Sequence, residues 1–580
     1  MRVAFVEIEN FRGIKNLEWA PAAKINCLIG PGDSTKTTVL DAIELALNPR
    51  SYIFADDSDF FDLIADDPIK ITVALVGLPP EFIADNRYGM HLRGWDNQHE
   101  RIEDEPREGL EYALSVRVQI DKSLEARWSI FNERIGEDSD KSEPPAMRYK
   151  DAQRVGTTRL GPYAERHLGW GRHSVLTHIG EKTDSVYLQL AEANRAAREA
   201  FRQNNENVFK DTVARAQDLG KHFAVPVRKK YGAELDVQGI SITAGGIALH
   251  DGNLPLRRLG TGSSRLIVCA LQHDAGGSHV ALIDEIEHGL EPHRIARLLK
   301  YLKSSSGGAE EPPAPQMFIT THSPVVIREL VAADIFAVRS VAGSTTVKSV
   351  AATAKNLDTA QRHLRHSPDA FLARRVIVSE GRTEQGFLRG ADTWWSSQEK
   401  DSFAVRGVTA IDGGSSSKAL AIAEHLIDLG YGVSVVLDAD EPTDAVTVAD
   451  VKKKGGVVHE WPDACSTEER IFLDVPWDVV VALLGFAEEC VGADSTRHHI
   501  NAACSAKGLA TLSNLAMPAT LDNEQFRRAL GIAAKNKNRP WFKDISRAEQ
   551  VAAIVAPCLE KIRETPLAQT MTALRQWVDE

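Results

Sequence analysis

The 580-residue sequence has few cysteines and no long apolar run, and each of these absences excludes a class of protein. Its six cysteines are scattered without a CxxC pair, which argues against a disulfide framework or zinc site and fits a reducing cytoplasm. No apolar run approaches the roughly 18 residues that a membrane span requires. The opening residues, MRVAFVEIENFRG, lack a basic segment followed by an apolar one, so we expect no signal peptide, a cytoplasmic location and no membrane partner.

Length and charge set further bounds. A chain of this length is too long for one core and predicts two to four domains. The formal net charge of -13 counts against a nucleic-acid partner, because phosphate backbones are bound by Lys and Arg. Net charge averages over the whole surface, however, and carboxylates gathered at a metal site also make the total negative. Two local stretches, RLGPYAERHLGWGRH and KNKNRPWFK, are basic.

The hydrophobic pattern predicts two α/β regions. Apolar or alternating runs typical of strands occur at 2–9, 24–29, 70–77, 111–120, 279–283, 317–321, 375–379 and 433–437. A polar, alanine-rich stretch at 183–222 has helical spacing, and we expect a helical insertion over about 155–230 that is either a solvated helix pair or a dimerisation arm. We place one domain at 1–365 and a second at 370–580, the last hundred residues being mostly helical.

The segment GPGDSTKT (30–37) lies between an apolar run and the helical pattern TTVLDAIELAL. Strand, glycine-containing loop and helix are the context in which backbone N–H groups surround a phosphate. The spacing matches GxxxxGK[ST] except that Thr35 replaces the last glycine. Because glycine permits positive φ and close approach of phosphate, Thr35 predicts a strained loop or weak ATP binding. Lys36 would reach the β- and γ-phosphates, and the Thr37 hydroxyl would ligate Mg²⁺.

Three further segments support an ATP site over a plain strand–turn–helix corner. In HVALIDEIEHGLEPHR, Asp284 and Glu285 end an apolar run, where one carboxylate would hold Mg²⁺ through water and the next would polarise the attacking water. LGTGSSR (259–265) is rich in glycine and hydroxyls at a helix start, which suits phosphate. His322 follows the run 317–321, where it would contact a γ-phosphate.

This set and order of motifs resembles the ABC-type ATPases of the SMC and RecF kind. Phe11-Arg12-Gly13 resembles their N-terminal element, 30–37 their Walker A loop, 259–265 their signature motif, and 289–293 their D-loop. The resemblance implies two ATPase heads that sandwich ATP, and therefore a homodimer or higher oligomer. It assigns ATP binding to Arg12, Gly30, Gly32, Asp33, Ser34, Thr35, Lys36, Thr37, Thr38, Gly262, Ser263, Asp284 and His322, with Glu285 catalytic.

A second set of carboxylates follows the second α/β pattern. Glu380 ends the run 375–379, and Glu384 follows four residues later. Asp438 and Asp440 end the run 433–437, and residues i and i+2 of an extended strand share a face. Carboxylates at neighbouring strand ends suit Mg²⁺ or Mn²⁺, and paired ions would clamp the oxygens of a phosphodiester. The alternative is a solvated acidic sheet edge.

The pattern Glu380…Asp438-x-Asp440 resembles the Toprim fold of topoisomerases, primases and certain nucleases. An ABC ATPase followed by Toprim is the architecture of the OLD family (overcoming lysogenisation defect) of ATP-dependent nucleases, a group that includes the nuclease subunit of the Gabija anti-phage system. The resemblance implies an ATP-regulated DNA endonuclease in phage defence, with double-stranded DNA as substrate and a UvrD-like helicase as partner.

That family also uses further carboxylates and a lysine near the C-terminus. STEERIF offers Glu468 and Glu469 as ligands for a second metal. KNKNRPWFK offers Lys535, Lys537 and Lys543, and we favour Lys537, with Lys543 next. A lysine there would neutralise charge on a pentacovalent phosphate.

Three other readings remain open. The first is a Toprim strand-passage or primase enzyme; a topoisomerase requires a tyrosine nucleophile, and no domain of the sequence presents one. A non-nucleolytic ATP-binding DNA clamp or signalling ATPase would carry a degenerate second site, and Thr35 leaves room for it. RNA is also open as the substrate.

Overall fold

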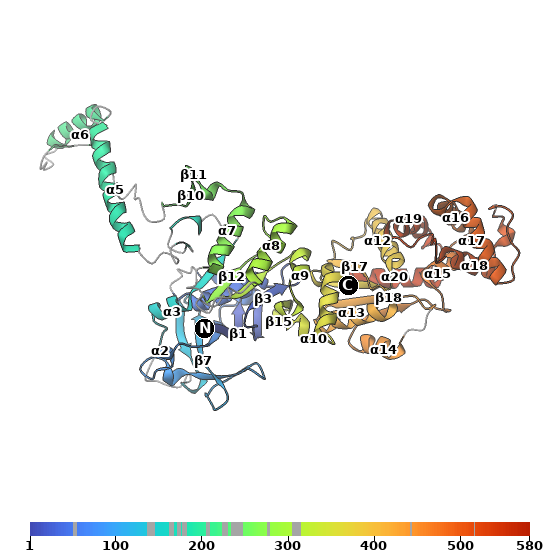
Figure 1. Ribbon diagram of the computed structural model, residues 1–580, viewed down its shortest axis with the longest axis horizontal. Coiled ribbons are helices and arrows are strands. Elements are labelled where there is room, and N and C mark those ends of the chain that lie inside the picture. The colour runs from blue at the N-terminus through green and yellow to red at the C-terminus, as the bar shows by residue number, and fades with distance from the viewer. Residues whose placement is uncertain are drawn as a thin grey trace. The chain divides into compact units, whose positions relative to one another are not determined.

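The computed structural model describes most of the chain in two compact units (Figure 1). The described residues are 1–49, 55–135, 145–161, 167–170, 174, 176, 183–204, 209–222, 230, 231, 233, 247–274, 279–303, 315–440, 444–515 and 517–580. Unit 1 comprises Met1–Arg12, Glu18–Asn26 and Thr37–Thr321, and unit 2 comprises Gly13–Leu17, Cys27–Lys36 and His322–Glu580. Within the described residues, no helix is both long and apolar enough to cross a membrane.

Unit 1 contains antiparallel strands in the order β6-β5-β7-β4-β1, with β8 paired to β7. Their bounds are β1 (Arg2–Phe11), β4 (Ile69–Val76), β5 (Arg93–Asp96), β6 (Arg101–Glu103), β7 (Glu111–Ile120) and β8 (Ala126–Phe131). In β4, a run of β-branched and aliphatic residues is buried almost throughout. The strands expected at 2–9, 70–77 and 111–120 are therefore present.

Three parallel strands of unit 1 lie in the order β13-β12-β9. They are β9 (Thr157–Leu160), β12 (Val280–Ile283) and β13 (Gln316–Thr320). Helices α7 (Thr261–Asp274) and α8 (Pro292–Lys303) precede and follow β12 in sequence, whereas α1 (Lys36–Leu47) lies much earlier. All four residues of β12 are buried, as a strand flanked on both sides requires. Because β12 ends at Ile283, the two acidic residues after it emerge at the carboxyl edge of the sheet.

The range 155–230, where a helical insertion is expected, contains one strand and two helices among its described residues. Residues Thr157–Leu160 form β9, which pairs in parallel with β12. The helices that follow are α5 (Thr183–Asn204) and α6 (Lys210–His222), labelled in Figure 1. Their contact includes stacked rings of Phe201 and Phe209, whose centroids are 6.3 Å apart. The shorter elements of unit 1 are α2 (Pro80–Ile83), α3 (Tyr149–Val155), β10 (His250–Asp251) and β11 (Leu254–Pro255).

Unit 2 includes the strand that leads into the loop 30–37 and the strands that pair beside it. β14 (Ile335–Val341) pairs in parallel with Cys27–Ile29 of β3 (Ile25–Ile29) and antiparallel with β15 (Ser344–Ser349). Ala342 and Gly343, with φ of 49° and 82°, form the two-residue turn of this hairpin. The remaining elements of this part are β2 (Ile14–Trp19), α9 (Pro324–Glu329), α10 (Val350–Thr353) and α11 (Leu357–His366).

A four-stranded parallel sheet in the order β17-β16-β18-β19 forms the centre of unit 2. Its strands are β16 (Arg375–Ser379), β17 (Val408–Asp412), β18 (Gly432–Leu437) and β19 (Val457–Glu460), and its crossover helices are α12 (Arg382–Ser397), α13 (Ser416–Asp428) and α14 (Ala445–Lys453). Helix α13 packs on β18 (Figure 1). Parallel strands joined by helices place all four carboxyl ends at one edge.

The C-terminal helices pack against this sheet's helices around an aromatic core that includes Phe472, Trp541 and Phe542. They are α15 (Thr467–Asp474), α16 (Trp477–Val491), α17 (Ala493–Ala506), α18 (Glu524–Ala534), α19 (Ile545–Val555) and α20 (Pro566–Asp579). Helix α12 approaches α19 closely at Gly386 and Gly390. A Cβ added at Gly386 would lie 2.5 Å from the carbonyl oxygen of Ile545, and one added at Gly390 would lie 2.5 Å from that of Glu549. These glycines are therefore required by packing.

Candidate functional site

The loop after β3 turns back on itself around the Lys36 ammonium. Gly30 has φ of 145°, and a Cβ there would lie 2.6 Å from the Val338 carbonyl oxygen, so only glycine fits. Lys36 is buried, and its Nζ donates hydrogen bonds to the carbonyl oxygens of Gly30 (3.2 Å) and Pro31 (2.7 Å) and to Ser34 Oγ (3.1 Å). The lysine is thus held inside the loop, where it would meet phosphate.

Thr35 has the left-handed conformation that its place in the loop demands. Its φ is 64°, and that of Asp33 is 58°. For a β-branched residue this region is an outlier and costs on the order of 1–3 kcal/mol. The Thr35 hydroxyl donates to the Ser34 carbonyl oxygen at 2.6 Å, which offsets part of that cost. The backbone strain expected at this position is therefore present.

Asp284 is a buried carboxylate at the end of β12 that contacts the first turn of α1. Its Oδ1 accepts hydrogen bonds from the hydroxyls of Thr37 (3.2 Å) and Thr320 (2.5 Å). Glu285 has φ of 47°, its N–H donates to Thr320 Oγ1 at 2.8 Å, and its side chain is exposed. The structure therefore brings Thr37 and Asp284 together, as an ATP-bound Mg²⁺ requires, and directs Glu285 outward.

The signature-type segment packs on the D-loop-type segment. A Cβ on Gly262, in the first turn of α7, would lie 2.1 Å from the Gly289 carbonyl oxygen. Ser263 Oγ accepts a hydrogen bond from Arg294 at 3.2 Å. His322 is exposed and immediately precedes Ser323, the N-cap of α9. Thr38 lies one residue beyond Thr37 in α1, and Gly32 occupies an open part of the loop.

Arg12 is expected to approach phosphate, but in the structure it binds two carboxylates. Its Nη1 lies 2.5 Å from Asp41 Oδ2 and its Nε 2.8 Å from Asp59 Oδ1. A phosphate contact would require the guanidinium to leave Asp41 or Asp59.

Two arginines that the motif analysis did not assign hold the end of β12. Arg265, fully buried, donates to the carbonyl oxygens of Gly161 (2.8 Å), Asp284 (2.6 Å) and Glu285 (2.8 Å). Arg159, on β9, contacts the side chain of Asp284. The available signal for Arg159 was a charged residue inside the short strand TTRL, which sequence patterns alone do not connect to Asp284.

In unit 2, the ends of β16 and β18 bring Glu380 and Asp438 together. These parallel strands are neighbours, and the Asp438 N–H donates to Glu380 Oε2 at 3.0 Å. Asp438 Oδ1 accepts from both the N–H (2.9 Å) and the hydroxyl (2.8 Å) of Thr467, at the start of α15. The two predicted metal-binding residues therefore lie at one sheet edge beside α15.

Glu384 and Glu468 complete a cluster of four carboxylates with Glu380 and Asp438, which we call the carboxylate cluster. Glu384 and Glu468 are 5% and 7% exposed. Glu384 Oε2 accepts the Gly381 N–H at 2.8 Å, and Glu468 Oε1 accepts the Thr383 hydroxyl at 3.3 Å. Glu469 instead caps α15 by accepting the Ser466 N–H, so helix geometry separates it from its neighbour.

Burial and repulsion from neighbouring carboxylates raise the pKa of two members of the carboxylate cluster, Glu384 and Asp438. Burial, followed by repulsion from Glu468 and Glu380, raises the pKa of Glu384 to about 7. Burial, followed by repulsion from Glu384, Glu468 and Glu380, raises the pKa of Asp438 to about 9. Burial is also the main cause of the raised pKa of Glu468. A divalent cation would offset this repulsion, and an all-oxygen donor set suits Mg²⁺ or Mn²⁺.

The side chains do not form a preassembled metal site. Throughout the described part of the chain, no three His, Cys, Asp or Glu side chains are arranged as metal ligands. Backbone N–H and hydroxyl donors already engage each member of the carboxylate cluster. The chemistry of the cluster fits a divalent cation, but binding one requires side chains to rotate.

We expect Asp438→Asn to raise thermal stability in EDTA at about pH 8, and to do so much less at about pH 5. The folded-state pKa of Asp438, about 9, lies above its ordinary 3.8, so its stabilising contribution is lost as pH rises through that window. Asparagine escapes this loss and can still accept both Thr467 hydrogen bonds. Melting temperatures at the two pH values measure it, with exposed Asp450→Asn as control. A variant destabilised equally at both values would contradict the prediction.

Of the three candidate lysines, Lys535 is the one that forms an ion pair with a carboxylate predicted to bind metal. Its Nζ forms an ion pair with Asp440 Oδ2. Burial opposes its charged form, yet Asp440, Glu468 and Asp438 together raise the pKa of Lys535. Lys543 contributes to the field at Glu468 as well. Among the residues that the structure describes, Lys537, which the sequence favoured, forms no ion pair with these carboxylates; it lies two residues further into the loop after α18.

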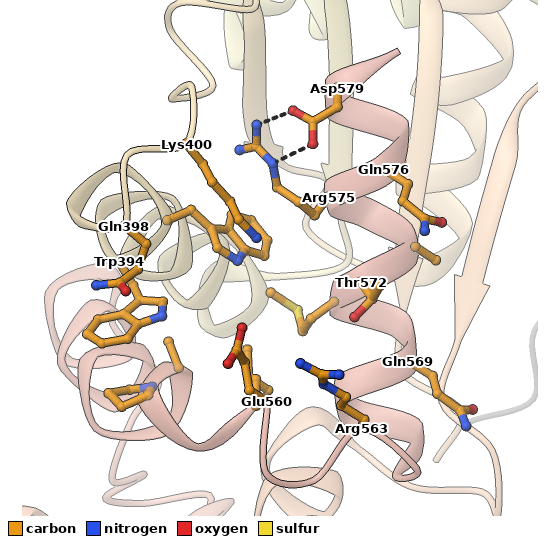
Figure 2. A pocket seen from close by; sticks show the side chains of 16 residues that line it. Trp394, Gln398, Lys400, Glu560, Arg563, Gln569, Thr572, Arg575, Gln576 and Asp579 are labelled. Carbon is orange, nitrogen blue, oxygen red and sulfur yellow. Dashed lines mark hydrogen bonds and ion pairs between the residues drawn. The ribbon is translucent and has the colours of Figure 1, made fainter.

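A pocket of about 890 Å³ lies elsewhere in unit 2, between the end of α12 and α20 (Figure 2). Trp394 and Lys400 lie on one side of it and Arg563 on the other, while Arg575 is engaged by Asp579. None of the residues of the carboxylate cluster lines this pocket. The pocket is therefore separate from the candidate metal site.

Comparisons with known proteins identify the ATPase part. A family model described as "AAA ATPase domain" matches residues 1–158, and one described as "AAA domain, putative AbiEii toxin, Type IV TA system" matches residues 104–328. The DNA replication and repair protein RecF of Chlorobium limicola is 37% identical over 59 residues, covering 10% of this chain and 16% of that protein. The chain thus matches less than a fifth of that relative's length.

Three solved structures are similar over 60% of this chain. They are an SMC head bound to the C-winged helix domain of ScpA (13% identity, 97% of that chain, TM-score 0.34), the SMC head domain from Thermotoga maritima (12%, 99%, 0.28) and the recombination mediator protein RecF (12%, 97%, 0.30). TM-scores below 0.5 carry no conclusion of their own. The family models show that the chain contains an ATPase domain of the AAA/ABC type, which binds ATP.

Proposed function

We propose that this ATPase is a divalent-metal-dependent DNA endonuclease whose cleavage site is the carboxylate cluster and whose activity is controlled by ATP. The observation that carries the proposal is the gathering of Glu380, Glu384, Asp438 and Glu468 at the carboxyl edge of a parallel sheet, with Lys535 beside them. Structural ion networks normally pair carboxylates with cations, whereas here four carboxylates share little positive charge. The resemblance to the Toprim pattern and to the OLD family supports the same function.

In this proposal, metal binding, charge stabilisation and control by ATP are carried out by different residues. Glu380 and Asp438, joined after rotation by Glu384 and Glu468, would hold Mg²⁺ or Mn²⁺, which supplies charge neutralisation and an activated water for phosphodiester hydrolysis. Lys535 would stabilise the charge that develops on the phosphate, after leaving Asp440 or while still bound to it. ATP at the loop 30–37 would control access of DNA and take no part in the cleavage itself.

The test is cleavage of supercoiled plasmid in Mg²⁺ or Mn²⁺, with and without ATP. We expect the wild-type protein to nick or linearise the plasmid and Asp438→Asn to lose at least about 100-fold of that rate, because a metal ligand is lost. Asp450→Asn, with its exposed carboxylate on α14, is the matched control and should cleave normally. Equal cleavage by wild type and Asp438→Asn would place the activity elsewhere.

One observation favours a second function, a non-nucleolytic ATP-binding DNA clamp. Protein donors already engage every carboxylate of the cluster, and Lys535 neutralises Asp440. A clamp would bind DNA in an ATP-dependent manner and leave the plasmid uncut in every lane. The DNA-binding assay beside the cleavage assay therefore separates the two functions.

A further inference from the structure

Arg159 connects two segments of the ATPase part that are remote in sequence. It lies on β9 opposite Leu282 of β12, two residues before Asp284. Its side chain is only 11% exposed. A charged side chain at such a place must be paired, because isolated burial of a charge is costly.

The guanidinium bridges two carboxylates. Arg159 Nη2 lies 2.9 Å from Asp41 Oδ1 and 3.2 Å from Asp284 Oδ2, and Nε lies 3.9 Å from Glu44 Oε2. Nη1 is buried and has no hydrogen-bond partner among the residues that the structure describes. The Nη2 atom therefore contacts both Asp41 and Asp284, and the buried Nη1 atom is a further donor beside them.

Asp284 is therefore held at both oxygens. Its Oδ1 accepts from Thr37 and Thr320, and its Oδ2 faces Arg159. We propose that Arg159 is a positioning residue for the ATPase site, which fixes Asp284 so that Oδ1 faces Thr37, where the cation bound with ATP is held. Without the guanidinium, Asp41 and Asp284 would lack their shared cation, and the Asp284 side chain would be free to rotate away from Thr37.

Asp41, one of the two carboxylates that contact Arg159, also contacts Arg12. Asp41 Oδ2 lies 2.5 Å from Arg12 Nη1, while its Oδ1 binds Arg159. One carboxylate on α1 therefore joins Arg12 to Arg159 and, through it, to Asp284. When Arg12 moves to a phosphate, Asp41 is left to Arg159 alone, which strengthens the hold on the guanidinium.

The experiment measures binding of a fluorescent ATP analogue to the full-length protein in Mg²⁺ and in EDTA. The wild type should bind more tightly in Mg²⁺, and Arg159→Ala should reduce this Mg²⁺ advantage by about tenfold while affinity in EDTA stays within about twofold. Arg159→Lys keeps the charge but cannot bridge two carboxylates in the same way, so its Mg²⁺ advantage should be intermediate. Arg154→Ala, which removes an exposed arginine paired with Glu81, is the control.

An unchanged or larger Mg²⁺ advantage in Arg159→Ala would overturn the proposal, because it would show that Arg159 only supports folding or competes with the cation for Asp284. Should the alanine variant fail to fold, Arg159→Lys and Asp41→Asn decide the matter. Both should lower the Mg²⁺ advantage, and no change in either would also overturn it. The proposal rests on ATP binding alone, so the outcome of the plasmid assay does not bear on it.

Discussion

Replacing Lys535 by alanine is expected to lower metal-dependent plasmid cleavage by about 100-fold, whereas Lys537→Ala should change it by less than about twofold. Lys535 is the lysine paired with Asp440, and its pKa is raised by the carboxylates of Asp440, Glu468 and Asp438 against the effect of burial. Its ammonium is therefore a positive charge beside the place where the carboxylate cluster would hold a phosphate. Initial rates of plasmid nicking in Mg²⁺ measure the effect.

Two controls make this result specific. Lys535→Arg retains a positive charge and should restore part of the activity lost in Lys535→Ala. Melting temperatures should show that all variants are folded. The ion pair between Lys535 and Asp440 is partly exposed, so its loss costs little stability. If Lys537→Ala abolished cleavage and Lys535→Ala did not, the assignment from the structure would be wrong and that from the sequence correct.

Lys36→Ala is expected to lower ATP hydrolysis by about 100-fold and to weaken ATP binding together with it. The Lys36 ammonium is buried among the carbonyl oxygens of its own loop, so the substitution removes a positive charge from the place where the phosphates would lie. Its removal also leaves those carbonyl oxygens without their shared donor. Phosphate release and binding of a fluorescent ATP analogue measure the two effects.

Lys24→Ala, at an exposed position before β3, serves as the control and should behave like the wild type. Plasmid cleavage by Lys36→Ala without ATP should be retained, because the carboxylate cluster does not depend on Lys36. Hydrolysis at the wild-type rate in Lys36→Ala would exclude this loop as the site of ATP hydrolysis.

The elements that sequence predicted well are those defined by local pattern. The apolar run before Asp284 and those before Glu380 and Asp438 form strands that end where expected, because a buried parallel strand is a short continuous apolar segment. The loop at Lys36 was recognisable because its chemistry resides in adjacent residues. A carboxylate that follows such a strand must emerge at the sheet edge, whatever the rest of the fold.

Features that depend on tertiary contacts were not predictable in the same way. Glu468 and Glu469 are adjacent in sequence, but the helix directs one into the cluster and the other to its own N-terminus. Lys535 is the C-cap residue of α18, whereas Lys537 lies two residues into the following loop, so which lysine reaches the carboxylates depends on where the helix ends. The bridge from Arg159 to Asp284 spans 125 residues, and only strand register could reveal it.

The left-handed threonine in the loop 30–37 restricts which residue fits at position 13. A Cβ at Gly13 would lie only 3.0 Å from Thr35 Cγ2, so the glycine that follows Arg12 provides the room for the threonine methyl. A side chain at position 13 would press on a residue whose backbone is already strained. The structure thus couples two positions that are twenty-two residues apart: a side chain at position 13 fits more easily when position 35 is glycine than when it is threonine.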